Sequence, residues 1–425
     1  MNSLPVRQEW STIPLRYVCQ LNPYVDFSGF QEDDQLTFLP MDRVKSGYFI
    51  SNSDKFSKYA SSYNAFEEGD IVLAKVTPCF ENGNIAVVEK LESGKGFGSS
   101  ELFVVRPEKV NRRFLFYYLQ SSAFKQAGEA SMTGAGGLKR VSPDLLRKYH
   151  LPYPEDDTQR LIADYLDRET ARIDALVSEK EKMRALLEEK RGVLINRAVT
   201  RGLDPAAPLK PSGIVWLEAI PKHWVIVRLK FFALIGYGLS QPPEYKVIGS
   251  PFVRATNVKQ GNLSTDGLVY VDESDLPPER TVRLSAGDLI VVRSGAYTGD
   301  SALVTREWEG SILGYDMIVR LYRFCYPEFV SFSFLSHYIL KDQINPLRLR
   351  AAQPHLNAED LGNLFFALPP LDEQQTICHH LMEESSQIKN AENLLQHSIN
   401  LLKERRSALI TAAVTGQIPV EEMHA

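Results

Sequence analysis

Two polar loops, one in each half of the 425-residue chain, carry side chains suited to binding chemistry. The first contains Lys75, Thr77, Asn82 and Asn84, directly after a short apolar run that predicts a strand. Lys and Arg heads and Asn amides pair with base edges in the DNA major groove, while hydroxyls suit phosphates. We therefore expect both loops to contact DNA, the second through four residues: Arg293, Ser294, Tyr297 and Thr298.

Further polar segments accompany these loops. A Gly-rich segment, 132–140, contains Lys139 and Arg140, and we align it with segment 351–356, which contains Gln353 and His355. Each of these residues alone is also typical of an ordinary polar turn, and their recurrence in both halves favours DNA binding. Another aligned pair of segments, 38–47 and 252–261, adds four candidate DNA contacts: Lys45, Arg254, Asn257 and Lys259.

Motifs for catalysis are missing. The sequence has no P-loop and no HExxH, and its four cysteines form no CxxC pair or metal-ligand cluster. The Gly-rich segment does not connect a strand to a helix, as a dinucleotide or S-adenosylmethionine loop would, so a flexible contact loop is the better interpretation. Asn22-Pro23-Tyr24 resembles part of an adenine methyltransferase tetrapeptide without its second proline, so a turn is favoured. The sequence predicts no catalytic residues, no metal site and no bound cofactor.

Composition limits the class of protein. Hydrophobic residues make up 44% and charged residues 24%, which is ordinary for globular domains. The net charge of −5 means that any DNA-binding surface must be local. No run of 18 apolar residues exists and the N-terminus has no apolar signal core, so we expect no membrane span. Four unpatterned cysteines are typical of a reduced, cytoplasmic protein.

The elements that position these loops are duplicated. Residues 159–200 align with 374–415 without a gap, at a constant offset of 215. The segments 38–47 and 252–261 align at an offset of 214, and 68–75 aligns with 286–293 at 218, which indicates an inserted loop. The chain therefore reads as a tandem duplication in the order domain, long helix, domain, long helix.

Both copies of the longest repeat have a heptad period interrupted by polar residues. At about 1.5 Å per residue, each copy predicts one helix of about 60 Å. A single such helix could lie on its own domain, whereas two matching copies favour a mutual coiled coil. We expect the interrupting residues Glu169, Lys180, Lys190, Glu384 and Arg405 to fix its register. The predicted apolar seam comprises Ile162, Leu166, Ile173, Leu187, Leu194, Ile377, Leu381, Ile388, Leu402 and Leu409.

The segments between the helices predict mainly β domains, each with one longer helix, at 114–126 and 329–341. Prolines end each domain just before its long helix, and a Pro/Gly-rich stretch joins the two halves. The predicted boundaries are 1–153 for the first domain, 154–203 for the first long helix, 204–214 for the linker, 215–369 for the second domain, 370–418 for the second long helix and 419–425 for the tail.

Four stretches taken together resemble a known family: 66–83, 98–107, 137–142 and 368–377. They are similar to the specificity subunits of type I restriction–modification systems, and the similarity covers nearly the whole chain. It implies an α+β fold of two mainly-β target-recognition domains, separated by two long antiparallel coiled-coil helices in a pseudo-twofold tandem duplication. In this family each domain reads one half of a split, asymmetric double-stranded DNA site.

The resemblance also implies that the catalysis belongs to partners. Two methyltransferase subunits would bind the long helices and would carry the S-adenosylmethionine, while the presence of motor-nuclease subunits stays open. Two alternatives remain: an orphan or phage-defence component with the same recognition fold, and a DNA methyltransferase with its own recognition domain, which the missing cofactor loop disfavours. One departure from the family is Thr158-Gln159 in the first copy, where the second copy has Glu373-Gln374.

Overall fold

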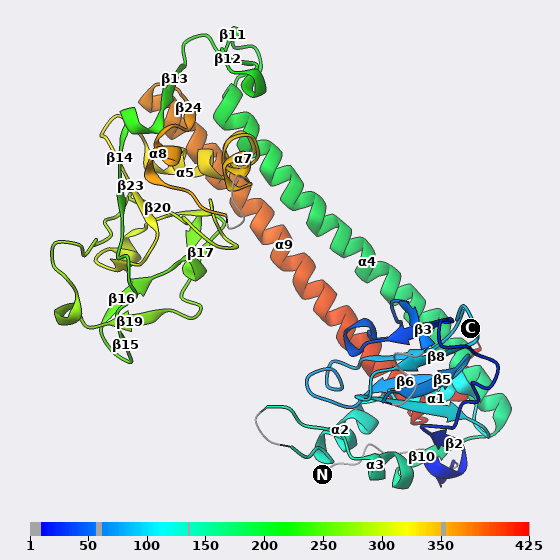
Figure 1. The fold of residues 1–425 in the computed structure, drawn as a ribbon. Helices are drawn as coiled ribbons and strands as arrows, with labels where there is room; N and C mark the ends of the chain where they lie inside the picture. Colours follow the sequence, from blue (N-terminus) through cyan, green and yellow to red (C-terminus); the bar gives the residue numbers. More distant parts are fainter. Residues whose placement is uncertain (1–9, 57–61, 135–136, 350–353, 425) are drawn as a thin grey trace. The chain divides into compact units, whose positions relative to one another are not determined.

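The chain folds as two units, and each contains one β-rich domain together with parts of both long helices (Figure 1). The computed structural model describes residues 10–56, 62–134, 137–349 and 354–424. Unit 1 consists of Met1–Glu181 and Gln396–Ala425, and unit 2 of Lys182–Leu395. The unit boundary therefore falls inside each long helix, rather than at the junctions between helices and domains.

Unit 1 contains two four-stranded sheets. The first is antiparallel throughout, whereas the second contains one parallel pair, β3 with β8. A further antiparallel pair, β1 with β10, joins the two ends of the domain. The first sheet has the order β2 (Cys19–Leu21), β9 (Leu102–Pro107), β6 (Ile71–Ala74), β7 (Ile85–Val87); the second has β4 (Ser53–Lys55), β3 (Gln35–Leu39), β8 (Lys95–Gly98), β5 (Asn64–Glu67); the joining pair is β1 (Ser11–Pro14) and β10 (His150–Tyr153).

In unit 2 the first sheet has the same strand order as in unit 1, whereas the parallel pair of the second sheet lies at one edge rather than in the middle. Its second sheet again contains one parallel pair, β16 with β22, and β13 with β24 joins the ends of the domain. The duplication predicted from sequence is thus visible in the strand order. The first sheet has the order β14 (Ala233–Tyr237), β23 (Met317–Leu321), β20 (Leu289–Val291), β21 (Ser301–Leu303); the second has β15 (Tyr245–Lys246), β19 (Val269–Val271), β16 (Ser250–Val253), β22 (Ile312–Leu313); the joining pair is β13 (Val225–Arg228) and β24 (Phe365–Leu368). Two small hairpins are added, β11 (Leu209–Pro211) with β12 (Ala219–Pro221) and β17 (Val258–Lys259) with β18 (Asn262–Leu263).

Strand β6 is apolar at every position because both of its faces are covered. Ile71 and Leu73 belong to the core cluster shared with the long helices, while Val72 and Ala74 belong to a separate cluster on the opposite face. Successive side chains of a strand point to opposite faces, so a strand between two cores cannot alternate apolar with polar residues. Its counterpart β20 divides its side chains between two clusters in the same way.

The two domain helices predicted as single elements are each broken, so that prediction was wrong. In unit 1 the first piece ends at Tyr118, and Ser121 caps the second, its side-chain oxygen accepting from the Phe124 N–H. In unit 2 the break falls at Ser336, whose hydroxyl donates to the Ser333 carbonyl. Serine at a helix start satisfies backbone donors that have no intrahelical partner. The pieces are α1 (Arg112–Tyr118) and α2 (Ser122–Ala130) in unit 1, and α5 (Pro327–Leu335), α6 (His337–Ile339), a π-helical turn (Leu340–Ile344) and α7 (Asn345–Arg348) in unit 2; each domain ends with a short helix, α3 (Pro143–Lys148) or α8 (Ala358–Gly362).

The long helices are α4 (Asp156–Arg201) and α9 (Leu371–Val414), and within each unit the beginning of one packs with the end of the other. In unit 1, Ile162 and Leu166 of α4 share a core with Ile410 and Val414 of α9. Unit 2 has the reciprocal arrangement, with Ile195, Ala198, Val199, Ile377 and Leu381 in one core. This pairing of beginning with end makes the helices antiparallel within both units.

The predicted seam faces inward. Six of its residues are buried, namely Ile162, Leu166, Ile173, Ile377, Leu381 and Ile388, and four are half-buried, namely Leu187, Leu194, Leu402 and Leu409. Two ion pairs join the helices in unit 1, Asp174 with Arg406 at 2.9 Å and Glu181 with Lys403 at 3.6 Å. These pairs use residues beside the predicted polar seam positions, because a charged head needs to lie at the edge of an apolar seam to remain solvated.

A buried glutamine amide fixes each domain to the start of the long helix that follows it. The Gln159 Oε1 atom accepts from the Asn111 N–H at 2.8 Å, and its Nε2 donates to the Pro154 carbonyl at 2.8 Å. The Gln374 amide makes the equivalent bonds to Tyr326 N–H and the Pro369 carbonyl, at 2.8 and 2.9 Å. Asn111 and Tyr326 are the residues at which the first domain helices begin. Each amide therefore joins three elements.

The departure at Thr158 leaves this contact intact. Glu373, which aligns with Thr158, accepts from the indole N–H of Trp224 at 3.1 Å and lies 2.7 Å from the His223 ring. That additional anchor belongs to unit 2, whereas the glutamine contact is present in both units.

Each domain is also fixed to the end of the other long helix. In unit 1 the Ser122 N–H donates to the Thr411 hydroxyl at 2.9 Å, and in unit 2 the Tyr338 N–H donates to the Asn196 side-chain oxygen at 3.1 Å. Asn196 and Thr411 align in the repeat, and their donors stand at the start of the second piece of each domain helix. Both long helices therefore hold both domains.

We predict that Gln159→Leu and Gln374→Leu each loosen their own unit. Each substitution leaves a buried N–H and a buried carbonyl unpaired, which costs about 1–3 kcal/mol of local stability. Hydrogen exchange should accelerate at Asn111 in the first variant and at Tyr326 in the second. Gln375→Leu, at the exposed neighbouring position of α9, is the matched control. If exchange in Gln159→Leu or Gln374→Leu is no faster than in this control, the amide does not have the proposed role.

Candidate nucleic-acid interface

The two predicted loops occupy the same place in their units. Each follows the central strand of the first sheet, β6 in unit 1 and β20 in unit 2. The Val141 N–H donates to the Lys75 carbonyl at 2.8 Å, and the Leu356 N–H donates to the Arg293 carbonyl at 2.8 Å. These equivalent bonds bring the second polar segment of each domain beside the first.

Thr77 braces the first loop from within. Its hydroxyl donates to the Gly137 carbonyl at 2.9 Å and accepts from the Lys139 N–H at 3.0 Å. Its own N–H donates to the Lys139 carbonyl. Because the Thr77 hydroxyl both donates to and accepts from the backbone of the neighbouring segment, it holds the loop in place and its proton is not available to a ligand.

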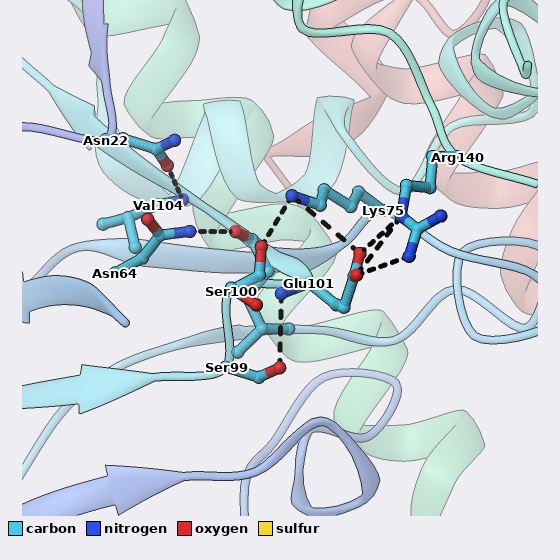
Figure 2. A network of polar contacts seen from close by, with 9 residues as sticks. Asn22, Asn64, Lys75, Ser99, Ser100, Glu101, Val104 and Arg140 are labelled. Carbon is cyan, nitrogen blue, oxygen red and sulfur yellow. Dashed lines mark hydrogen bonds and ion pairs between the residues drawn. The ribbon is translucent and has the colours of Figure 1, made fainter. Parts of the chain in front are cut away.

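Lys75 and Arg140 meet at a carboxylate that the sequence did not single out (Figure 2). Arg140 donates to Glu101 through Nε at 3.0 Å and through a terminal nitrogen at 2.7 Å. The Lys75 amine lies 3.9 Å from the same carboxylate and donates to the Ser100 carbonyl at 2.6 Å. The hydrogen bond from Arg140 lowers the pKa of Glu101, so the carboxylate stays charged. In the sequence, Glu101 is marked only by its place directly before the apolar run that forms β9. That it faces Lys75 follows from the pairing of β6 with β9.

The remaining candidates of unit 1 differ in exposure. The side chains of Asn82 and Lys139 are exposed, and those of Asn84 and Lys45 are half-buried. Lys45 lies beside the loop, because its carbonyl accepts from the Ile85 N–H at the start of β7. An approaching ligand therefore meets Asn82, Lys139 and the free edge of Arg140 first.

Arg293 in unit 2 lies against two aromatic rings. Its guanidinium carbon lies 4.6 Å from the centre of the Tyr237 ring and 4.3 Å from that of Tyr315. The Nε atom of Arg293 is buried without a hydrogen-bond partner. Contact with two rings restrains the guanidinium, and among the described residues Arg293 forms no ion pair.

A buried carboxyl lies beneath this arginine. Asp316 accepts from the Arg293 N–H at 3.2 Å and is 2% exposed. Burial raises the pKa of the Asp316 carboxyl from 3.8 to about 6, because a charged carboxylate is poorly solvated there, while the Arg293 N–H and the charge of Arg293 oppose the shift.

The side chains of two predicted DNA contacts are buried. Asn257 is 0% exposed, and its amide donates to the carbonyls of Ser264 and Asp266 while its oxygen accepts from the Arg254 N–H. Thr298 is also 0% exposed, and its hydroxyl donates to the Gly295 carbonyl at 2.7 Å. Both side chains satisfy backbone groups inside a turn, a role that uses the same residue types as base recognition.

The other candidates of unit 2 fall into two groups. Ser294 and His355 pair through their backbones, and His355 and Tyr297 are exposed. Arg254 and Lys259 belong instead to the second sheet and its hairpin, where Arg254 donates to the Gly267 carbonyl at 2.6 Å and Lys259 pairs with Asp266 at 2.6 Å. Gln353 lies outside the described residues.

Two further features concern the described residues only. No group of three or more His, Cys, Asp or Glu side chains among them could hold a metal ion. Within the same residues, no helix combines the length and the apolar character needed to cross a membrane.

We predict a pH-dependent stability of unit 2 that depends on Asp316. Its folded-state pKa is raised, so the folded unit keeps the proton to higher pH than the unfolded chain. The stability is full below about pH 4 and falls as the pH rises through about 6, by at most about 3 kcal/mol. Asp316→Asn keeps the oxygen that accepts from Arg293 but cannot ionise. The melting temperature of this variant relative to the native chain should rise between pH 4 and 7.

The matched control is Asp272→Asn. Hydrogen bonds from Ser274 lower the pKa of the exposed Asp272, so its pH-dependent contribution to stability lies below about pH 4, and this substitution should leave the melting difference nearly constant between pH 4 and 7. A melting difference for Asp316→Asn that does not change with pH would show that the carboxyl is not neutral in the folded unit.

Comparisons with known proteins agree with this arrangement of two equivalent domains. The model of a family described as "Type I restriction modification DNA specificity domain" matches residues 8–183 and again 221–397. The EcoAI specificity subunit of Escherichia coli is 34% identical over 164 residues, which cover 37% of this chain and 27% of that one. The EcoKI specificity subunit of Escherichia coli K12 is 21% identical over 442 residues, covering 99% and 92% of the two chains.

The matched length differs between relatives. The chain spans only about a quarter of the EcoAI and EcoEI subunits, 27% and 26% of their lengths. Solved structures share the fold: one from a study of complex assembly of the type I R-M system superposes with a TM-score of 0.73, 17% identity and coverage of 98% and 100% of the two chains. The HsdS subunit of Thermoanaerobacter tengcongensis gives a TM-score of 0.51 at 17% identity, over 98% and 99%. Because the family model matches both halves and most of the sequence, this chain belongs to the type I restriction–modification DNA specificity family.

Proposed function

We propose that this chain is the DNA sequence-recognition subunit of a type I restriction–modification complex and carries no catalytic site of its own. The observation that carries the proposal is the pair of equivalent loops, each after the central strand of a like sheet and held by the same backbone bond. Equivalent positions with unlike side chains are what a protein needs to read two unlike half-sites with one scaffold.

The exposed side chains supply the proposed base contacts. In the first domain these are Asn82, Lys139 and Arg140, and in the second they are Tyr297 and His355, to which we add the half-buried Arg293. Asn and Arg pair bidentately with adenine and guanine, respectively. Lys45, Lys259 and Ser294 are suited to phosphates, which position the domain without selecting a base. A net charge of −5 supports such local contacts rather than a wholly basic surface.

The long helices are the proposed spacer between the readers. We assign residues 1–153 and 215–369 to the recognition domains, and 154–203 and 370–418 to the helices that separate them. Because each domain is anchored to both helices, through Gln159 and Thr411 or through Gln374 and Asn196, a change in one helix is shared by both domains. A spacer of this kind sets a constant number of unread base pairs between the half-sites.

The helices also offer a docking surface for partners. Leu186 of α4 and Leu401 of α9 align in the repeat and remain 62% and 50% exposed. Equivalent exposed leucines on the two helices suit two copies of one partner, and we assign them to two methyltransferase subunits, which would carry S-adenosylmethionine. Motor-nuclease subunits would join the complete restriction complex. The free cysteines Cys19, Cys79, Cys325 and Cys378 suit action in the reducing cytoplasm, where cellular DNA lies.

Expression of this chain with its methyltransferase in a host without DNA methylation tests the proposal. Modified-base sequencing should find methylated adenine in a bipartite asymmetric motif, with one constant gap in every methylated site. Methylation without the chain, or a continuous motif, would overturn the proposed function. An orphan recognition component would bind DNA in this assay and leave it unmethylated.

We predict that Leu186→Glu and Leu401→Glu each weaken binding of the methyltransferase by about tenfold or more, because a charge replaces an apolar contact at the interface. The affinity is measured by titration in the absence of DNA. Val247→Glu makes the same change at an exposed apolar position of the second domain and should bind normally. Native affinity in both leucine variants would place the docking surface elsewhere.

A further inference from the structure

In both domains, one residue just before the neighbouring strand faces the cationic residue that follows the central strand, Lys75 or Arg293. Ala74 of β6 pairs with Leu102 of β9, so the next residue along, Lys75, faces Glu101. Val291 of β20 pairs with Met317 of β23, so the counterpart of Lys75, Arg293, faces Tyr315 two residues before that pair. Glu101 and Tyr315 are therefore equivalent by strand register. Their side chains are unlike, yet each contacts an arginine: Glu101 contacts Arg140, and Tyr315 contacts Arg293.

Glu101 fixes the plane of Arg140 and leaves one edge free. Nε and one terminal nitrogen of Arg140 bond the carboxylate, at 3.0 and 2.7 Å. The opposite edge, formed by the two terminal nitrogens, keeps a pair of parallel donors, because a guanidinium has five N–H groups. The Arg140 side chain is 46% exposed, and Figure 2 shows the guanidinium joined to Glu101. The lowered pKa of Glu101 keeps this contact charged at neutral pH.

Tyr315 performs the same task by stacking. Together with Tyr237 it contacts the Arg293 guanidinium, and the Nε of Arg293 is buried without a partner. Burying that donor unpaired carries a cost, so contact with the rings must hold the guanidinium in place, while Asp316 accepts from the backbone N–H of the same residue. The terminal nitrogens again form the free edge. An ion pair in one domain and contact with two aromatic rings in the other thus lead to one outcome, a restrained arginine fork.

A rigid arginine fork matches one base better than the others. Guanine presents O6 and N7 as two acceptors in the major groove, and arginine meets both at once. Fixing the fork beforehand avoids the entropy lost when a flexible side chain is ordered on binding. Lysine in the same place offers a point charge and cannot form the pair of parallel bonds.

We propose that Glu101 and Tyr315 are positioning residues that orient Arg140 and Arg293 to read one guanine in each half-site. This inference rests on the proposed function and extends it, because it names the base and the residues that determine the specificity at one position of each half-site. The loss of one bidentate contact to guanine changes discrimination by about 5- to 150-fold.

The test uses the full chain in complex with its methyltransferase. Methylation rates are measured on a set of sites in which each base pair of the bipartite motif is replaced in turn. Glu101→Ala should relax discrimination at one G·C pair of one half-site by about tenfold or more, and Arg140→Lys should relax the same pair. Tyr315→Ala and Arg293→Lys should relax one G·C pair of the other half-site. Each pair of variants is the control for the other, since the untouched half-site should be read as before.

Glu101→Gln provides a second variant in case Glu101→Ala lowers the stability of the domain. Its amide oxygen still accepts one bond from Arg140, so discrimination at that pair should lie between the native and alanine values. Relaxation at every position alike would mean that Glu101 only repels DNA or stabilises the loop, and would overturn the inference. So would unchanged discrimination, or different positions affected by Glu101→Ala and Arg140→Lys. A native complex that methylates no bipartite motif would instead overturn the proposed function.

Discussion

The fold depends on a buried amide at the start of each long helix. Gln159 and Gln374 each satisfy one backbone donor and one backbone acceptor that belong to different elements. An amide is suited to this place because it carries a donor and an acceptor on one planar group, and both are satisfied without placing a charge in the core. In each unit the amide thereby fixes the long helix relative to the first domain helix and to the segment that follows the last strand of the domain.

On this common frame the two domains differ where recognition requires it. Both units share the strand order of the first sheet, one parallel pair in the second sheet and the bond that holds the two polar segments together. The side chains at the strand end are not: Lys75 and Glu101 stand where Arg293 and Tyr315 stand in the second domain. Different residues thus determine stability and specificity, so the DNA-contacting side chains of the two domains can differ while the strands and hydrogen bonds that support them are kept.

The sequence was most informative about structure where a pattern extended over many residues. The gapless repeat predicted both long helices, and all ten seam residues are buried or half-buried. It was least informative for single polar residues in turns. Asn257 and Thr298 have the residue types expected of DNA contacts, yet both are spent on backbone groups inside a turn. The broken domain helices were missed because one serine cap outweighs an otherwise continuous apolar pattern.

The sequence by itself determined the duplication, the long helices and the family, because these rest on repeated spacing and on motifs that are contiguous in the chain. Only the tertiary structure decided which polar side chains are free. Glu101 lies far from Arg140 in sequence and meets it because β9 runs beside β6, whose loop is bonded to the segment that carries Arg140. Contacts of this kind are set by strand register and hydrogen-bond pairing, which no local pattern records.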